Sequence, residues 1–151
     1  MTESSISQYG GLEAVIEEHG FFSWLDLEIE DIEHGRVVLG VPYDEKFTNL
    51  AFDDGTADVH GGVAATLIDT ASGFALRSTF EKPDEATLTT TDLNVSYLRP
   101  ATDDLTVEAE VVRAGGSMGV TDATVSSIAP DGEQTEVAVG RTSYRLFRGD
   151  R

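Results

Sequence analysis

The segment that most constrains this chain is residues 63–76, VAATLIDTASGFAL, in which Asp69 is the only ionisable side chain. The length and apolar character of this run predict a helix that packs into a core. A buried carboxylate without a partner costs several kcal/mol, so Asp69 is either hydrogen-bonded for a structural reason or kept for chemistry. The segment by itself favours neither reading.

The predicted helix has two faces that differ in side-chain size. At about 100° per residue, the neighbours of Asp69 on its own face are mostly small, and the opposite face is bulkier. The first face holds Gly62, Ala65, Thr66, Ser72, Gly73 and Leu76, and the second holds Val63, Leu67, Ala71 and Phe74. Glycine inside a helix costs about 1 kcal/mol relative to alanine, so Gly73 indicates a place that must stay open. A structural Asp69 would instead bond the hydroxyl of Thr66 or Ser72.

His60, Gly61 and Gly62 stand directly before this segment. Glycines at a helix start leave backbone N–H groups accessible, and the unpaired donors of the first turn favour negative charge. The triplet therefore predicts an oxyanion site at Gly61. The alternative is that His60 only caps the helix.

The spacing between these two features predicts an oligomer. Residues 60 and 69 of one helix lie roughly 13 Å apart, too far for both to contact one reacting atom. If Gly61 and Asp69 act on the same carbonyl group, they must come from two subunits whose helices run antiparallel. We therefore expect a two-fold dimer with two shared sites.

The composition of the chain is typical of a single globular domain. We expect this domain to span residues 1–151, with a flexible N-terminus at residues 1–11. Hydrophobic residues make up 40% and charged residues 25%, and no apolar run approaches the roughly 18 residues of a membrane span. The N-terminus lacks the features of a signal peptide, so we expect a cytoplasmic protein. The absence of cysteine excludes disulfides and thiol nucleophiles.

The chain is strongly acidic, with 28 acidic and 10 basic residues and a formal net charge of -18. This balance argues against nucleic acid and anionic membranes as partners. It resembles the lysine-poor surfaces of halophilic proteins, which work in a salt-saturated cytoplasm. The three histidines, His19, His34 and His60, have no metal-ligand spacing, so we expect no metal.

The rest of the chain predicts an α+β fold. A helix is expected at about 12–22 and a strand at 36–43, with Pro42 near the end of the strand. Four long strands follow the central helix, at about 86–98, 105–113, 120–128 and 135–147. Turn-forming residues separate them, which predicts a meander packed against the central helix.

Several motifs in this order resemble one known family. They are FTN at 47–49, HGGVAATLIDTASGFAL at 60–76, TTTDLNVSYLRPA at 89–101 and VVRAGGSMGV at 111–120. Together they resemble the hotdog-fold acyl-CoA thioesterases of the phenylacetate-degradation (PaaI-like) type, from about residue 21 to 145. The resemblance implies a long central helix on a curved antiparallel sheet, and a double-hotdog dimer that often pairs into a tetramer. It also implies hydrolysis of a thioester to a free acid and coenzyme A, with no cofactor beyond the coenzyme A of the substrate.

The resemblance places five site residues on this chain. The acid falls on Asp69, the oxyanion amide on Gly61, the helix-start histidine on His60, the upstream asparagine on Asn49 and a hydroxyl on Thr90. Asp69 of the partner would act as base or nucleophile, and Thr90 would hold the water. Asn49 would orient a carboxylate or the thioester, while His60 would fix the loop and polarise the site.

Two departures from the family pattern concern these residues. The loop 50–59 is longer than usual, which bears on the position of Asn49, and threonine stands at 90 where serine is common. As an ordinary strand residue, Thr90 would have no catalytic role.

For the other parts of the substrate, the sequence indicates several candidate binding residues without ranking them. Arg77, Arg99 and Arg113 could contact the phosphates of coenzyme A, and Leu76, Phe80 or the first helix could line the acyl pocket. Two other functions stay open: a hotdog hydratase or dehydratase, and a non-catalytic acyl-CoA-binding or regulatory module in which Asp69 is dispensable.

Overall fold

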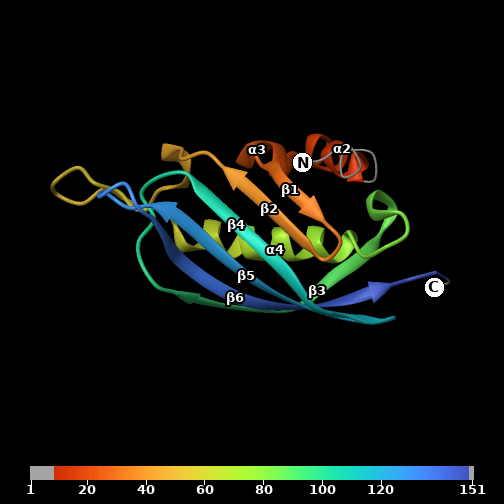
Figure 1. Ribbon diagram of the computed structural model, residues 1–151. Helices are drawn as coiled ribbons and strands as arrows, with labels where there is room; N and C mark the ends of the chain where they lie inside the picture. The colour runs from red at the N-terminus through yellow and green to blue at the C-terminus, as the bar shows by residue number, and fades with distance from the viewer. Residues whose placement is uncertain (1–8, 150–151) are drawn as a thin grey trace.

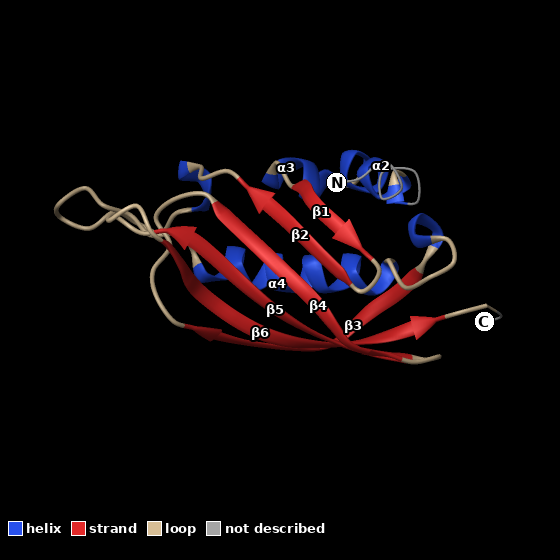
Figure 2. Ribbon diagram, in the orientation of Figure 1, coloured by secondary structure: helices blue, strands red, loops and turns tan. Residues whose placement is uncertain are grey.

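The computed structural model describes residues 9–149 and consists of one antiparallel sheet, a long helix and smaller helices at one side (Figures 1 and 2). The helices are α2 (Gly11–Glu18), α3 (Gly20–Leu25) and α4 (Gly61–Arg77), with 3-10 turns at Glu45–Phe47 and Pro83–Glu85. The strands are β1 (Glu28–Glu33), β2 (Arg36–Val41), β3 (Thr87–Tyr97), β4 (Leu105–Ala114), β5 (Met118–Ile128) and β6 (Gln134–Phe147). Most of the expected N-terminal segment 1–11 lies outside the described residues, but Tyr9 is buried and Gly11 begins α2.

The six strands are ordered β1-β2-β4-β5-β6-β3, and Figure 1 shows the sheet curving around α4. The expected long helix on a curved antiparallel sheet, of the α+β class, is confirmed. The meander is confirmed for β4, β5 and β6 but is wrong for β3, which pairs with β6 at the far edge. Residues 98–104 carry the chain across the end of the sheet. They contain turn-forming residues, which end a strand but do not determine which strand it pairs with.

Two further elements differ from the sequence prediction. The helix expected at 12–22 is divided because His19 has an extended backbone (φ -89°, ψ 111°) and its Nδ1 accepts the N–H of Phe22, which starts α3. Strand β1 was not predicted. Its sequence EIEDIE carries many acids, and a bulge between Ile29 and Asp31 interrupts the apolar alternation.

The core lies between α4 and the concave face of the sheet. α4 packs against β2, β3, β4, β5 and β6. Its fully buried residues include Leu67, Ile68, Ala71 and Ala75, and full burial of a leucine or isoleucine stabilises the fold by about 1.5–3 kcal/mol. The helix faces differ in part from the sequence prediction, since Ser72 and Leu76 are buried. On the other side of the helix, Thr66, Asp69, Thr70 and Gly73 are only half-buried.

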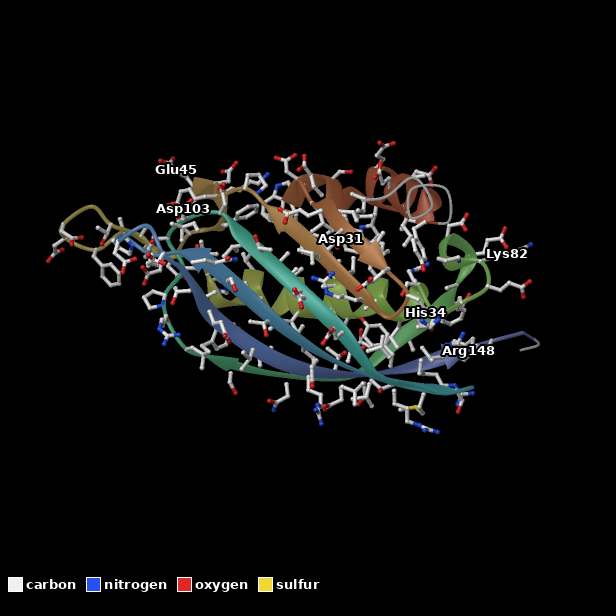
Figure 3. The ribbon with its side chains drawn as sticks, in the orientation of Figure 1. Asp31, His34, Glu45, Lys82, Asp103 and Arg148 are labelled. Carbon is white, nitrogen blue, oxygen red and sulfur yellow. The ribbon has the colours of Figure 1, made fainter. Side chains whose placement is uncertain are left out.

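The convex face of the sheet is acidic. Glu108, Glu110, Asp122 and Glu136 lie there with Thr124 and Ser126 along one shallow groove. Arg36 and Arg141 pair with some of these acids, at 3.0 Å to Glu108 and 2.6 Å to Asp122. Figure 3 shows charged side chains at both ends of the molecule, with Glu45 and Asp103 at one end and Lys82 and Arg148 at the other. Within residues 9–149, no helix is long and apolar enough to cross a membrane.

Candidate active site

Asp69 is held by hydroxyl groups that come from the sheet and not from its own helix. The Oγ1 of Thr90, on β3, donates to Oδ1 of Asp69 at 2.7 Å. The hydroxyl of Tyr144, on β6, lies 2.6 Å from the same Oδ1 and 2.6 Å from the backbone carbonyl oxygen of Asp69. Thr66, an expected alternative partner, donates instead to the carbonyl of Gly62 at 2.8 Å. The carboxylate is therefore fixed by two strands that are remote in sequence.

Tyr144 is buried, with 6% of its surface exposed. Burial, and then the hydrogen bond with Asp69, raise the pKa of the Tyr144 phenol well above its usual value. The phenol therefore stays protonated at neutral pH and can donate a hydrogen. Gly73 makes room for it, because a Cβ at that position would lie 3.1 Å from the Tyr144 hydroxyl.

A cavity of about 410 Å³ opens beside Asp69 and Thr90. Its apolar wall is formed by Val15, Phe21, Phe22, Phe74 and Leu88, and its polar lining includes His19, Thr66 and Arg77. The first helices therefore contribute to this wall, as one of the sequence alternatives proposed. Leu76 does not line this cavity, and it packs with Tyr144 and Leu146, against which Phe80 also packs.

A second cavity, of about 350 Å³, lies at the start of α4 and is lined by Asn49, His60, Gly61, Tyr97 and Arg99 among others. His60 is the N-cap of α4, and its Nδ1 accepts the N–H of Gly62 at 2.8 Å. The capping alternative is thus what the structure shows for this side chain. The N–H of Gly61 has no acceptor among residues 9–149, and Gly61 lines this cavity.

The long loop 50–59 does not remove Asn49 from this cavity. A bridge joins Thr48 to Val59 at the base of the loop, and the N–H of Asn49 donates to the carbonyl of Asp58 at 2.8 Å. A further hydrogen bond joins His60 N–H to the carbonyl of Phe47 at 2.7 Å. The extra residues therefore extend outward while Asn49 stays beside His60.

One chain does not bring the five expected residues together. Asp69 and Thr90 line the first cavity, Asn49, His60 and Gly61 line the second, and the two cavities share no residue of the described chain. This division is what the helix spacing predicts for a site that needs two subunits.

The three candidate arginines also separate. Arg77 lines the Asp69 cavity, where burial lowers the pKa of its guanidinium, and Arg99 lines the Gly61 cavity. Arg113 lies in a third groove near His34, away from both.

Two tyrosines at the site were not anticipated from sequence. Tyr144 contacts Asp69 from 75 residues away, and the hydroxyl of Tyr97 donates to the carbonyl of Gly61 at 2.7 Å. Both residues lay in predicted strands, where tyrosine is common for packing reasons alone. No local signal distinguished them.

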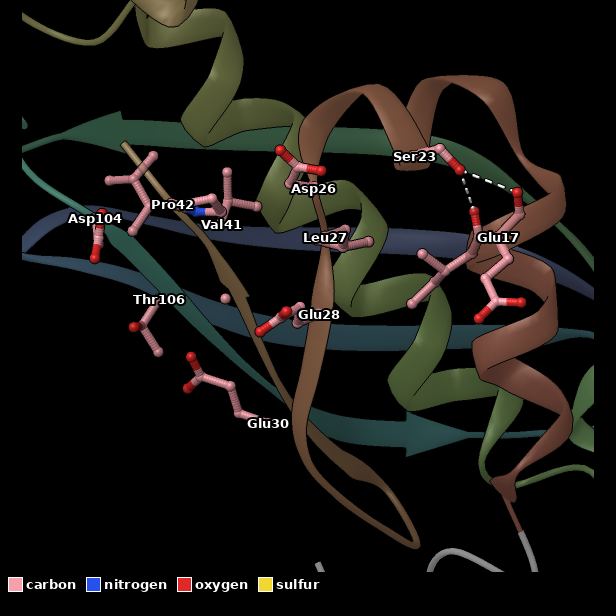
Figure 4. Close-up of a pocket in the computed structure, with 13 residues that line it drawn as sticks. Glu17, Ser23, Asp26, Leu27, Glu28, Glu30, Val41, Pro42, Asp104 and Thr106 are labelled. Atoms are coloured by element: carbon pink, nitrogen blue, oxygen red, sulfur yellow. Dashed lines mark hydrogen bonds between the residues drawn. The ribbon is translucent and has the colours of Figure 1, made fainter. Parts of the chain in front are cut away.

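A larger cavity, of about 620 Å³, lies between α2, α3 and the edge of the sheet (Figure 4). Figure 4 shows Glu17, Asp26, Glu28, Glu30 and Asp104 around it, so its negative charge disfavours an anionic substrate. Within residues 9–149 no group of three His, Asp or Glu side chains is arranged to hold a metal.

Comparison with known proteins gives concordant matches. Residues 57–131 match the thioesterase superfamily. The chain is 50% identical over 141 residues to a protein of Halobacterium salinarum that is provisionally named an esterase, and the match covers 92% of each chain. It is 32% identical over 89 residues to human acyl-coenzyme A thioesterase 13, which covers 58% of each chain.

Comparison with solved structures identifies the same fold. A thioesterase family protein from Silicibacter pomeroyi superposes with a TM-score of 0.81 at 28% identity, covering 94% of this chain and 99% of that one. The E. coli PaaI protein of the phenylacetic acid degradation operon superposes with a TM-score of 0.76 at 23% identity, covering 96% of each. These matches confirm the hotdog fold that the motifs implied.

Proposed function

Because this chain belongs to the thioesterase superfamily, we propose that it is an acyl-CoA thioesterase, which hydrolyses an acyl-CoA to a free carboxylic acid and coenzyme A. One observation carries the proposal. Helix α4 has a free N–H at its start, at Gly61, and a firmly hydrogen-bonded carboxylate about two turns later, at Asp69, and each lines its own cavity.

The N–H of Gly61 is the proposed oxyanion donor. As the thioester carbonyl is attacked, its oxygen gains negative charge, and a fixed backbone donor at a helix start stabilises that charge with little reorganisation. One such donor contributes roughly 3 kcal/mol to the transition state. The cap formed by His60 supports this role, since it occupies the neighbouring N–H of Gly62 and leaves that of Gly61 free.

Asp69 is the proposed base or nucleophile. As a base, it takes a proton from water while the water oxygen bonds to the carbonyl carbon, and the C–S bond then breaks to release the thiol of coenzyme A. As a nucleophile, its carboxylate bonds to that carbon and expels the thiolate, and water then hydrolyses the mixed anhydride. Thr90 donates to Asp69 and retains lone pairs that can accept a hydrogen from the attacking water.

The complete site requires a second copy of the chain. Gly61 and Asp69 lie eight positions apart on one helix, about 12 Å, so the donor and the carboxylate at one thioester belong to different subunits. β3 is the last strand of the sheet, and almost all of its eleven residues are exposed. A strand edge of this length offers unpaired backbone groups to a second copy. We propose a two-fold dimer that forms along β3 and sets the two α4 helices antiparallel.

Binding of the anionic coenzyme A arm requires local positive charge at the site. The chain carries a formal charge of -18, so its overall field repels phosphates. Arg99 lines the Gly61 cavity and Arg77 lines the Asp69 cavity, so each cavity has one arginine among its described lining residues. The apolar wall that includes Phe21, Phe22 and Phe74 suits the acyl group.

The test is thiol release from a panel of aryl- and fatty-acyl-CoA substrates in high salt. We expect hydrolysis by the native protein and a loss by a factor of roughly 10² to 10⁴ in Asp69→Asn. Asp53→Asn, the same change on an exposed loop, is the matched control. Equal hydrolysis by native protein and Asp69→Asn would remove Asp69 from the mechanism.

The same panel separates the other functions. Absence of hydrolysis with intact acyl-CoA affinity would overturn the proposal in favour of a binding module. Hydration of an enoyl-CoA without thiol release would overturn it in favour of a hydratase.

A further inference from the structure

Asp69 receives both of its side-chain hydrogen bonds on one oxygen. Thr90 Oγ1 at 2.7 Å and the Tyr144 hydroxyl at 2.6 Å both hydrogen-bond Oδ1, and no described residue hydrogen-bonds Oδ2. A carboxylate bonded in this way cannot rotate freely, and its second oxygen is the one left for chemistry. The two carboxylate oxygens of Asp69 therefore differ in their hydrogen bonding.

The Tyr144 hydroxyl has two acceptors within reach and one hydrogen to give. Both the carbonyl oxygen and Oδ1 of Asp69 lie at 2.6 Å. Hydrogen bonds to an ionised oxygen are roughly twice as strong as those between neutral groups, so the hydrogen is given to Oδ1. Because burial and Asp69 raise the pKa of Tyr144, the hydrogen is retained throughout the neutral range.

Gly73 makes this contact sterically feasible. It lies one turn after Asp69 on α4, and an added Cβ would lie 3.1 Å from the hydroxyl oxygen and 3.5 Å from Cζ of Tyr144. The first distance is tighter than ordinary van der Waals contact and the second is not. A methyl group at position 73 would therefore displace the hydroxyl while leaving room for a phenylalanine ring.

We propose that Tyr144 is a positioning residue, which holds Oδ1 of Asp69 so that Oδ2 is the oxygen that receives the proton from water or attacks the thioester. This inference rests on the proposed thioesterase function. A merely structural hydroxyl would tie β6 to α4 and affect stability alone. A positioning hydroxyl affects the reacting step, so its loss changes kcat and leaves substrate binding nearly unaltered.

The experiment compares kcat, KM and the unfolding midpoint for Tyr144→Phe, Gly73→Ala and the double variant. We expect kcat to fall about tenfold in Tyr144→Phe, with KM changed by less than about twofold. Gly73→Ala should lower kcat similarly in the native background but add little once the hydroxyl is gone, so the two effects should not add. Tyr43→Phe, a change at an exposed tyrosine outside both cavities, is the matched control.

The outcomes separate this inference from the proposed function. If Asp69→Asn is inactive but Tyr144→Phe retains native kcat, the positioning role is wrong and the thioesterase proposal stands. If Asp69→Asn is fully active, the proposed function itself fails. Should Tyr144→Phe unfold, Gly73→Ala still tests the contact, because native kcat in a folded Gly73→Ala would contradict the role. Where all three variants fold, full additivity of the two effects would also contradict it.

Discussion

The N–H of Gly62 donates to Nδ1 of His60 at 2.8 Å, which makes His60 the cap of the helix that carries both halves of the candidate site. An unpaired donor in the first turn is thereby satisfied. The role of His60 in polarising the site stays a prediction.

Replacing this cap should affect stability in a graded way. We expect His60→Ala to lower the free energy of unfolding by about 1 kcal/mol. His60→Asn should lose much less of the native stability, because asparagine is also a good N-cap. Urea unfolding in high salt measures the stability of both variants, with His34→Ala on an exposed turn as the control. Equal stability of the alanine and asparagine variants would contradict the capping role.

The donor role of Gly61 can be separated from its small size. Proline at the first helical position removes the N–H without breaking the helix, and the extended backbone of His60 suits a following proline. We expect Gly61→Pro to lower kcat by roughly 10² to 10³. Gly61→Ala adds a Cβ at the same 3.1 Å from the Tyr97 ring but keeps the N–H, so its loss should be much smaller. Equal losses would assign the effect to the clash with Tyr97.

A shared site predicts recovery of activity in mixed oligomers. A dimer of one Asp69→Asn chain and one Gly61→Pro chain has one site with both groups intact and one with neither. Co-expression in equal amounts should therefore restore about one quarter of native activity, since half of the dimers are mixed. Light scattering on the same samples reads the number of subunits, including the tetramer that the resemblance implies. No recovery in verified mixed dimers would place each site within one chain.

Two buried threonines should tolerate loss of their hydroxyls. Thr121 and Thr142 face each other across β5 and β6, are fully buried, and have no side-chain partner among residues 9–149. An unpaired buried hydroxyl costs about 1–3 kcal/mol, so Thr121→Val and Thr142→Val should each raise the free energy of unfolding by about 1 kcal/mol. Thr124→Val on the convex face is the control. Destabilisation by either core change would show that its hydroxyl is satisfied, for example by enclosed water.

Salt should stabilise this chain through its acidic surface. The Debye length falls from about 10 Å at 0.1 M to about 3 Å at 1 M, which screens repulsion among the acids of the sheet. We expect the urea midpoint to rise with KCl. Glu110→Gln should raise the low-salt midpoint, whereas Glu108→Gln should not, because Glu108 pairs with Arg36 at 3.0 Å. A midpoint independent of salt would exclude this explanation of the composition.

Local structure could be predicted from neighbouring residues alone. The run 63–76 identified α4, and turn-forming residues marked the ends of β4, β5 and β6, because helix periodicity, strand alternation and turns depend on residues close in sequence. The separation of Gly61 from Asp69 followed from helix geometry in the same way. That geometry is also the basis of the predicted dimer.

Contacts between distant segments were decided only in the tertiary structure. The place of β3 beside β6, the hydroxyl of Tyr144 on Asp69 and that of Tyr97 on Gly61 join residues that are 36 to 75 positions apart or lie on different strands. Such contacts depend on which strand edges and faces come together when the core is buried. The sequence by itself determined which chemical groups α4 carries and how far apart they lie, and the packing of the sheet on α4 decided how those groups are held.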